Sequence, residues 1–176
     1  MKKIIITYGL VAGAIVTAFM AYGVYSLNKN PNYEGSMLLG YTGMLVAFTF
    51  VFIGVKKYRD TQNEGVITFG KALQIGALIS LIASTIYVGV WLFEYYCLYP
   101  DFMDKYADCM LKKMDKTTMT AIEIKAKTEE MMQYKEMYKN PLWVIVLTYA
   151  EILLPIGLLA PILSALILKR KQTKNN

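Results

Sequence analysis

The chain has 176 residues, of which 56% are hydrophobic and 18% charged, and its 19 basic and 13 acidic residues give a net charge of +6. Soluble domains carry about 25% charged residues, so this composition argues against a soluble enzyme and against a disordered chain. Histidine is absent and there are two cysteines, which excludes His-based catalytic triads, imidazole metal sites and Cys₄ sites. We therefore expect no metal and no cofactor.

The first apolar segment, residues 4–27, carries no charged residue. A membrane-spanning helix needs about 20 apolar residues, so this segment is long enough. Lys2 and Lys3 before it resemble the start of a secretory signal, and Ala12-Gly13-Ala14 resembles a cleavage site. The apolar run continues well beyond Ala14, whereas a cleaved signal becomes polar there, so we interpret the segment as a retained transmembrane helix.

Three further segments have the same character, at residues 37–55, 72–93 and 142–168. They are apolar on all sides and show no period of two, which indicates helices in lipid rather than surface helices or strands. The last segment is interrupted by Glu151, Pro155 and Pro161. The fold class that we expect is all-α: a single membrane domain over residues 1–176, with four transmembrane helices at 4–27, 37–55, 72–93 and 142–168.

The basic residues predict the orientation in the membrane, because short cytoplasmic segments carry an excess of Lys and Arg. Two lie before the first segment, four lie between the second and third, and four follow the last: Lys2, Lys3, Lys56, Lys57, Arg59, Lys71, Lys169, Arg170, Lys171 and Lys174. We therefore place both termini in the cytoplasm, in a bacterial inner membrane. The lipid bilayer is the expected partner, and no nucleic-acid motif accompanies the positive charge.

Aromatic residues lie near the predicted outer ends of the helices: Tyr22, Tyr25, Tyr33, Trp91, Tyr95, Tyr96, Tyr99, Tyr138 and Trp143. Such positions are typical of the aromatic belts that anchor helices at the headgroup level. We interpret these residues as anchors rather than as a ligand cage.

The long polar segment 94–141 is predicted to be an extracytoplasmic helical loop, since 48 residues without structure would be unusual. Asp101 can cap a first helix that extends to Asp115, and Thr117 and Thr118 mark a break. Thr120 with Glu123 fits a capping box that begins a second helix, which extends to about Lys139. Asn140-Pro141 would then end it.

The same loop contains both cysteines and many methionines. Cys97 and Cys109 would lie outside the cytoplasm, where they could form a disulfide or remain as two buried thiols. The methionines, which are Met103, Met110, Met114, Met119, Met131, Met132 and Met137, suit hydrophobic packing first, a partner surface second and a Cu(I) site least.

Glu151 is the most informative single residue, because a carboxylate inside the hydrocarbon is costly. Pro155 and Pro161 lack an N–H, so they would free the carbonyl groups of Glu151 and Gly157. Glu151, Pro155 and Gly157 could therefore line a proton or cation pathway. The structural alternative is a protonated Glu151 that bonds to a neighbouring helix, for which depth along the helices nominates Thr17, Tyr22, Thr42, Ser84 and Tyr87. A lone carboxylate supports no catalytic site.

Small residues form two stripes at a spacing of four. One comprises Gly9, Gly13, Thr17 and Ala21, and the other comprises Gly76, Ser80 and Ser84. Such stripes allow close approach of two backbones, either within the bundle or between protomers.

Several short motifs together resemble the bacterial membrane protein family known as domain of unknown function 4199. They are Lys57-Tyr58-Arg59-Asp60, Ile67-Thr68-Phe69-Gly70-Lys71-Ala72, Asp101-Phe102, Asp104-Lys105-Tyr106, Asn140-Pro141-Leu142, Thr148 with Glu151-Ile152, Pro155-Ile156-Gly157 and Ser164-Ala165-Leu166-Ile167-Leu168-Lys169. The family pattern has Gly-Gly where this chain has Glu64-Gly65. The resemblance implies an integral inner-membrane protein and implies no activity.

In this inner segment Thr68 can cap the third helix and Gly65 can provide a turn. A small ligand pocket there is a minor alternative. For the whole chain we expect a non-enzymatic envelope component or accessory subunit that assembles with itself or with another membrane protein. The competing hypothesis is a small proton- or cation-coupled transporter that uses Glu151.

Overall fold

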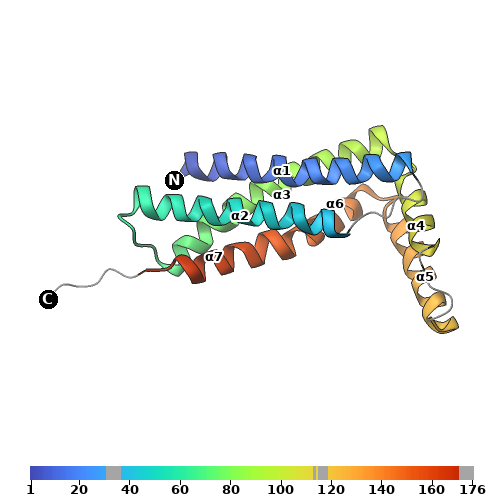
Figure 1. The fold of residues 1–176 in the computed structure, drawn as a ribbon. Helices are drawn as coiled ribbons and strands as arrows, with labels where there is room; N and C mark the ends of the chain where they lie inside the picture. Colours follow the sequence, from blue (N-terminus) through green and yellow to red (C-terminus); the bar gives the residue numbers. More distant parts are fainter. Residues whose placement is uncertain (31–36, 113, 115–118, 171–176) are drawn as a thin grey trace.

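The computed structural model describes residues 1–30, 37–112, 114 and 119–170 of the chain. These residues are almost entirely helical (Figure 1). The elements, in chain order, are α1 (Lys2–Lys29), α2 (Met37–Gln62), α3 (Phe69–Phe93), η1 (Glu94–Leu98), α4 (Phe102–Lys112), α5 (Ala121–Met137), α6 (Pro141–Ile152), η2 (Leu153–Leu159) and α7 (Ala160–Leu168), where η1 and η2 are π-helical.

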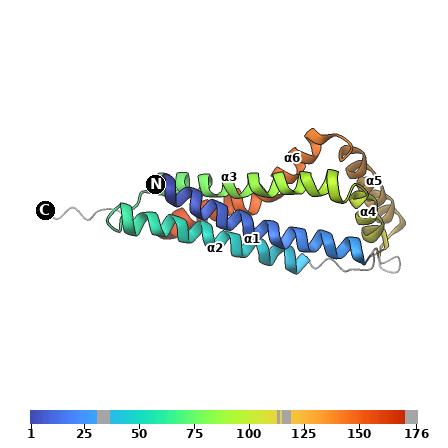
Figure 2. The ribbon, with the colours of Figure 1, turned by 90° about the horizontal axis from the view of Figure 1, so that it is seen from above.

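Three long helices and one short helix form a bundle, in which α1, α2, α3 and the short α7 lie side by side (Figures 1 and 2). Their buried faces meet in one apolar core that runs along the bundle and includes Ala12, Val51, Ile79, Ile156 and Ala165. The α4 and α5 helices stand across one end of the bundle (Figure 1). The α6 helix leans away from α3 toward α5 (Figure 2).

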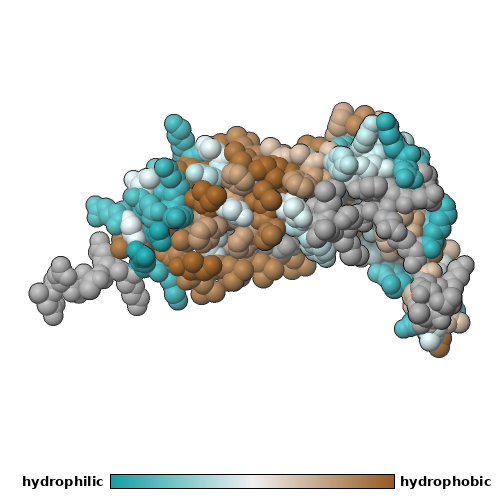
Figure 3. Space-filling model, in the orientation of Figure 1, coloured by the Kyte–Doolittle hydropathy of each residue, from teal (hydrophilic) through white to brown (hydrophobic). Residues whose placement is uncertain are grey.

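The helices long and apolar enough to cross a membrane include Lys2–Lys29 and Phe69–Leu98. Pro141–Ile152 and Ile156–Leu168 qualify together, with a bend of 50° between them. The surface of the bundle is apolar along its middle, and polar residues gather toward its ends (Figure 3). Over the described residues, the structure therefore contains two helices that could span a membrane, or three such spans if the bent pair is one, and α2 is not counted among them.

The first small-residue stripe, on α1, packs against α3 inside the bundle. A Cβ atom added to Gly9 would lie 2.7 Å from the Cβ atom of Ile82, and one added to Gly13 would lie 3.1 Å from the Cα atom of Ala83. Glycine is therefore what allows α1 to approach α3 so closely. Glycine in the second stripe likewise allows α3 to approach α7 closely, because a Cβ atom on Gly76 would lie 3.0 Å from the Cα atom of Pro161.

Both ends of the described chain lie at the end of the bundle opposite to α4 and α5. The terminal amine of Met1 donates a hydrogen bond to the side-chain oxygen of Gln62, where α2 ends. Arg170 pairs with Ile67 through two backbone hydrogen bonds of 2.9 and 3.2 Å. The chain therefore starts and finishes beside the connection between α2 and α3, as the alternating direction of four helices predicts.

The last apolar segment, predicted over 142–168 with interruptions at Glu151, Pro155 and Pro161, is bent in the structure. It is divided into α6, the π-helix η2 and α7. Pro155 lies within η2, and Pro161 lies at the start of α7. In a π-helix each N–H pairs with the carbonyl five residues earlier, so in this register the backbone partner of the Ile156 carbonyl would be Pro161, which has no N–H. The Ser80 hydroxyl supplies that hydrogen bond instead, at 2.8 Å.

Two helix caps predicted from the sequence are confirmed. Thr120 and Glu123 form a complete capping box at the start of α5, and the Thr68 hydroxyl accepts a hydrogen bond from the Lys71 amide at the start of α3. The polar segment begins later than predicted, because η1 continues α3 to Leu98. The predicted helix end at Asp115 and the predicted break at Thr117 and Thr118 lie outside the described residues.

Candidate functional site

A cavity of about 560 Å³ lies where α4 and α5 meet the bundle. The α-helices α1, α3, α4, α5 and α6 line it together with the π-helix η2. Its lining residues are Met20, Val24, Tyr87, Trp91, Phe102, Met103, Tyr106, Glu130, Met131, Tyr134, Tyr138, Leu147, Thr148, Ala150, Glu151 and Leu154. Aromatic rings and methionines form most of the wall. The two charged residues that line it are both carboxylates, and no lining residue is basic.

Glu151 projects from α6 into this cavity and is exposed rather than buried between helices. Of the five partners predicted by depth, the cavity brings Tyr87 to Glu151. Thr17, Tyr22, Thr42 and Ser84 do not line the cavity. Depth along a helix gives the height of a residue but not the side on which it lies, and this explains why four of the five nominated residues do not line the cavity.

Three tyrosines line the cavity together with Glu151: Tyr87, Tyr106 and Tyr138. Burial raises the pKa of Tyr138 to about 12, and burial likewise raises the pKa of the Tyr106 hydroxyl. Both hydroxyls are therefore neutral at physiological pH and can act as donors. The Tyr138 side chain hydrogen-bonds to Thr148, whose own hydroxyl donates to the Val144 carbonyl at 2.6 Å.

Stacked and edge-to-face rings hold one wall of the cavity. The Trp91 ring centre lies 4.9 Å from that of Phe102 at an interplanar angle of 80°, and Phe102 stacks on Tyr106 at 5.9 Å. Tyr95 contacts both Trp91 and Tyr138, at 5.6 and 5.5 Å. Such pairs favour offset or edge-to-face geometry and contribute about 0.5–1.5 kcal/mol each.

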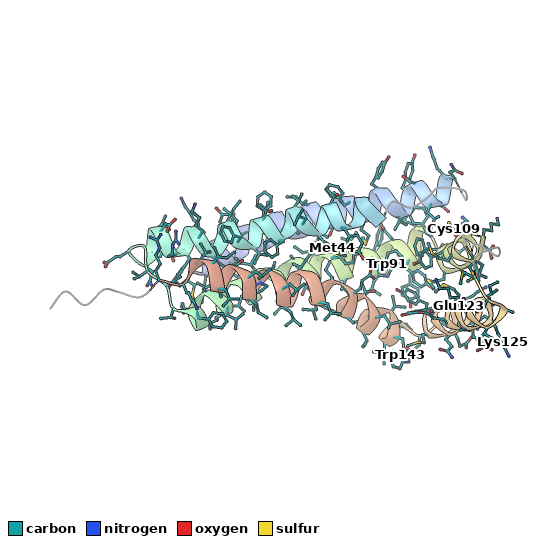
Figure 4. The ribbon with its side chains drawn as sticks, turned by 60° about the horizontal axis from the view of Figure 1, so that its bottom comes forward. Met44, Trp91, Cys109, Glu123, Lys125 and Trp143 are labelled. Carbon is teal, nitrogen blue, oxygen red and sulfur yellow. The ribbon has the colours of Figure 1, made fainter. Side chains whose placement is uncertain are left out.

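The prediction that these rings are all interface anchors is therefore wrong for Trp91 and Tyr95. Trp91 is only 6% exposed and points toward the space between the bundle and the α4–α5 pair, whereas Trp143 is 46% exposed on the outer side of α6 (Figure 4). Tyr22 and Tyr25 are exposed, as anchors should be. Tyr33 lies outside the described residues. The α4–α5 pair covers Trp91, and that contact is not visible in the sequence.

Ionic and polar contacts fix α4 and α5 over the cavity. Lys105 on α4 bonds to the Asn28 side chain at the end of α1 and forms an ion pair of 2.6 Å with Asp101. Lys135 on α5 pairs with Asp104 on α4. The Lys105 ammonium holds the pKa of the Asp101 carboxyl below its usual range, and the Asp104 carboxylate raises the pKa of Lys135.

Two carboxylates near this end were not predicted as site residues. Glu130 lines the cavity from α5, where it shares one helix face with Tyr134 and Tyr138. That spacing of four residues is a signal that the sequence does contain. Glu94 is only 7% exposed, and its Oε2 atom has no hydrogen-bond partner among the described residues. In the sequence Glu94 follows directly after an apolar segment, where a charged residue is expected to be exposed, so its burial could not be predicted.

The two cysteines are not joined by a disulfide. Cys97 is exposed on η1, and Cys109 is buried on α4 (Figure 4). The methionines are used in two ways: Met103 and Met131 line the cavity, whereas Met132 is exposed. In the part of the chain that the structure describes, no group of three or more His, Cys, Asp or Glu side chains is placed to hold a metal ion.

A second hollow, of about 530 Å³, lies at the opposite end of the bundle. It is lined by Gln62, Asn63, Glu64, Val66, Ile67, Thr68 and Arg170. The turn here contains Glu64 at φ +52° and Gly65 at φ +78°. This is the inner segment for which the sequence allows a small pocket, but it has none of the aromatic wall found at the other end.

The chain can now be compared with known proteins. No curated protein and no solved structure matches it. A family model, described as protein of unknown function (DUF4199), matches residues 7–170. This match covers the bundle, the α4–α5 pair and the cavity between them. The chain therefore belongs to the DUF4199 family, as the motifs from Lys57 to Lys169 indicate.

Proposed function

We propose that this protein is a four-span component of a bacterial inner membrane, with both termini in the cytoplasm and α4 and α5 on the outer face. Support for the fourth span comes from α2, whose residues 37–55 contain no charge and whose 26-residue length exceeds the thickness of a bilayer. The bent segment from α6 to α7 serves as one span. Basic residues at the end that contains Met1 and Arg170 support the orientation.

The role that we propose is non-enzymatic: binding at the outer face as an envelope component or accessory subunit. The observation that carries this proposal is the cavity, which α4 and α5 enclose together with α1, α3 and α6. Below it the core is closed, because Ile152, Ile156 and Ile79 are almost fully buried. A cavity beside such a closely packed core suits binding better than passage through the membrane.

The surface of α5 supports assembly with a second membrane protein or a second copy. Ile122 is 82% exposed and Met132 is 64% exposed on this helix, in which no residue is buried. Large apolar side chains exposed on a helix outside the bilayer are typical of contact surfaces. The α4–α5 pair would therefore present the partner-binding face.

Photo-crosslinking tests this assembly. A photoreactive amino acid at Met132 should capture one dominant neighbour in native membranes, and the same group at Lys125, a polar exposed site on the same helix, should capture little of it. Capture of a diffuse set of proteins from both sites, or of none from Met132, would contradict the proposed role.

A proton or cation pathway through Glu151 is the second candidate, and a specific observation favours it. Glu151 lies in the cavity two residues before the π-helix η2, and such breaks are typical of sites in transporters. In proteoliposomes, Glu151→Gln should then abolish a proton or cation flux that the wild-type protein carries. Absence of flux from the folded wild-type protein would exclude this candidate and favour the binding role.

A further inference from the structure

The wall of the outer cavity combines two kinds of group that rarely occur together by chance in an apolar protein. Its aromatic faces come from α3, α4 and α5, and include Tyr87, Trp91, Tyr106 and Tyr138. Its two charged groups, Glu130 and Glu151, come from α5 and α6. Aromatic faces attract cations through the negative potential of the ring, and carboxylates do so through their charge.

The negative charge of the cavity is not neutralised by nearby lysines. Lys105 pairs with Asp101 and Asn28, and Lys135 pairs with Asp104, so both are engaged elsewhere. Neither Glu130 nor Glu151 forms an ion pair with any side chain that the structure describes. The groups that face Glu151 are tyrosine hydroxyls, which are hydrogen-bond donors without a positive charge.

The wall suits an organic cation better than a metal ion. The described carboxylates are too dispersed to form a metal-ligand cluster, and sulfur and aromatic atoms dominate the lining. A cavity of about 560 Å³ also exceeds the volume of a bare ion by a wide margin. A ligand that fills it must bring apolar groups against the rings while it presents positive charge to the carboxylates.

We propose that this cavity binds an organic ammonium group, with Glu151 and Glu130 as its counter-ions and the Trp91, Tyr106 and Tyr138 rings as its apolar walls. This inference deepens the proposed binding role and rests on it for the placement of the cavity at the outer face. The ammonium group could come from an amine-bearing lipid headgroup or from a free amine. Both sources share the chemistry that the cavity recognises.

Trp91 provides a direct readout of binding. The chain has two tryptophans, and only Trp91 lines the cavity. Replacement of the surface residue Trp143 by Phe leaves Trp91 as the sole tryptophan. In nanodiscs of phosphatidylglycerol, titration of this W143F protein with benzyltrimethylammonium should change the Trp91 emission along a saturable curve. Benzyl alcohol and benzenesulfonate, which lack the positive charge, should give no saturable change at the same concentrations.

Matched carboxylate variants identify the counter-ions. In the W143F background, Glu151→Gln should weaken the apparent affinity for benzyltrimethylammonium by about tenfold or more, since removal of one charge from a close pair typically has at least this effect. Glu130→Gln should weaken it as well, and it tests the proposal separately if the first variant does not fold. Glu129→Gln is the control, because Glu129 adjoins Glu130 without lining the cavity.

The lipid composition of the nanodisc distinguishes the two sources. If the natural ligand is a lipid headgroup, phosphatidylethanolamine should compete with benzyltrimethylammonium and co-purify with wild-type protein but not with Glu151→Gln. If it is a free amine, affinity should be equal in both lipids. Either result supports the ammonium site. Equal response to the cation, the alcohol and the sulfonate, or equal affinity of the Glu130, Glu151 and Glu129 variants, would overturn it.

This experiment uses purified protein and needs no neighbour. Failure of the crosslinking experiment would therefore remove the proposed assembly without affecting the titration. Conversely, the crosslinking could capture a single neighbour while the Trp91 emission responds equally to the cation, the alcohol and the sulfonate. That outcome would overturn the ammonium site and leave the assembly intact.

Discussion

The hydroxyl group of Ser80 on α3 donates a hydrogen bond of 2.8 Å to the carbonyl oxygen of Ile156 in η2. Both residues are fully buried. The backbone partner of that carbonyl in a π-helix would be residue 161, which is a proline and has no N–H. One side chain on a neighbouring helix thus satisfies an acceptor that the proline leaves open, and it holds the broken span against α3.

Ser80→Ala should lower the free energy of unfolding by about 1–2 kcal/mol, because it leaves a buried carbonyl without a donor in an apolar environment. The free energy can be measured by SDS-driven unfolding of the protein in detergent micelles. Ser84→Ala is the matched control, since Ser84 lies one turn away on the same helix and its buried hydroxyl has no partner among the described residues. Equal loss in both variants would contradict the role of the Ser80 bond.

Gly13→Ala should destabilise the protein by about 1–3 kcal/mol, because the new methyl group would lie 3.1 Å from the Cα atom of Ala83 and force α1 away from α3. Gly23→Ala on the same helix meets no atom within 4 Å and should stabilise the protein slightly, by about 0.5–1 kcal/mol, through helix propensity. Thermal unfolding in detergent compares the two. If Gly13→Ala were as stable as Gly23→Ala, the close contact between α1 and α3 would be refuted.

The turn between α2 and α3 carries strain that a substitution should relieve. Glu64 adopts φ +52°, a left-handed conformation that costs a non-glycine residue about 1–2 kcal/mol. Glu64→Gly, which restores the Gly-Gly pair of the family pattern, should therefore stabilise the protein by about 0.5–1 kcal/mol. Gly65→Ala, at φ +78°, should destabilise it by about 1 kcal/mol. Unfolding midpoints that moved in the opposite directions would contradict this description of the turn.

The start of α5 should loosen at acid pH. The Thr120 backbone N–H donates a hydrogen bond to the Glu123 carboxylate, and this lowers the pKa of Glu123 from its ordinary value of 4.5. Because the folded-state pKa is the lower one, the stabilisation is complete above the ordinary value and is lost as the pH falls through the folded-state value.

Hydrogen exchange over residues 119–128, corrected for intrinsic rates, should therefore show faster exchange as the pH falls below about 4.5. Glu123→Gln can still form a capping box but cannot titrate, so its protection should not change with pH. Thr120→Ala should exchange faster at every pH. Wild-type protection that stayed constant down to pH 3 would show that the carboxylate form is not needed for the cap.

The sequence predicts the helices and their caps well, because these depend on residues close together in the chain. Helices follow from runs of apolar residues, and the caps follow from Thr68 and from Thr120 with Glu123. Gly9 and Gly13 are predicted as a contact stripe, though not with α3 as the partner. The π-helix is invisible to hydropathy, because a change of hydrogen-bond register alters no side chain.

The cavity itself could be predicted only in part. Glu151 is evident as a charge within an apolar segment, and Tyr87, one of the five residues that depth counting nominates, lines the same cavity. Glu130 and Trp91 join the site only because α5 folds back over the end of α3. No local sequence pattern predicts the angle between these two helices. The Lys105 contact to Asn28, which holds α4 in place, is equally long-range.

Labelling of single cysteines with a membrane-impermeant maleimide in spheroplasts tests the proposed membrane topology most directly. In a background with Cys97 and Cys109 replaced by Ala, a cysteine at Lys125 should react without permeabilisation. Cysteines at Lys2 and Arg170 should react only after the membrane is opened, because the proposed topology places both on the cytoplasmic side. Labelling of either terminal site in intact spheroplasts, or protection of the site at Lys125, would contradict the four-span arrangement with α5 outside.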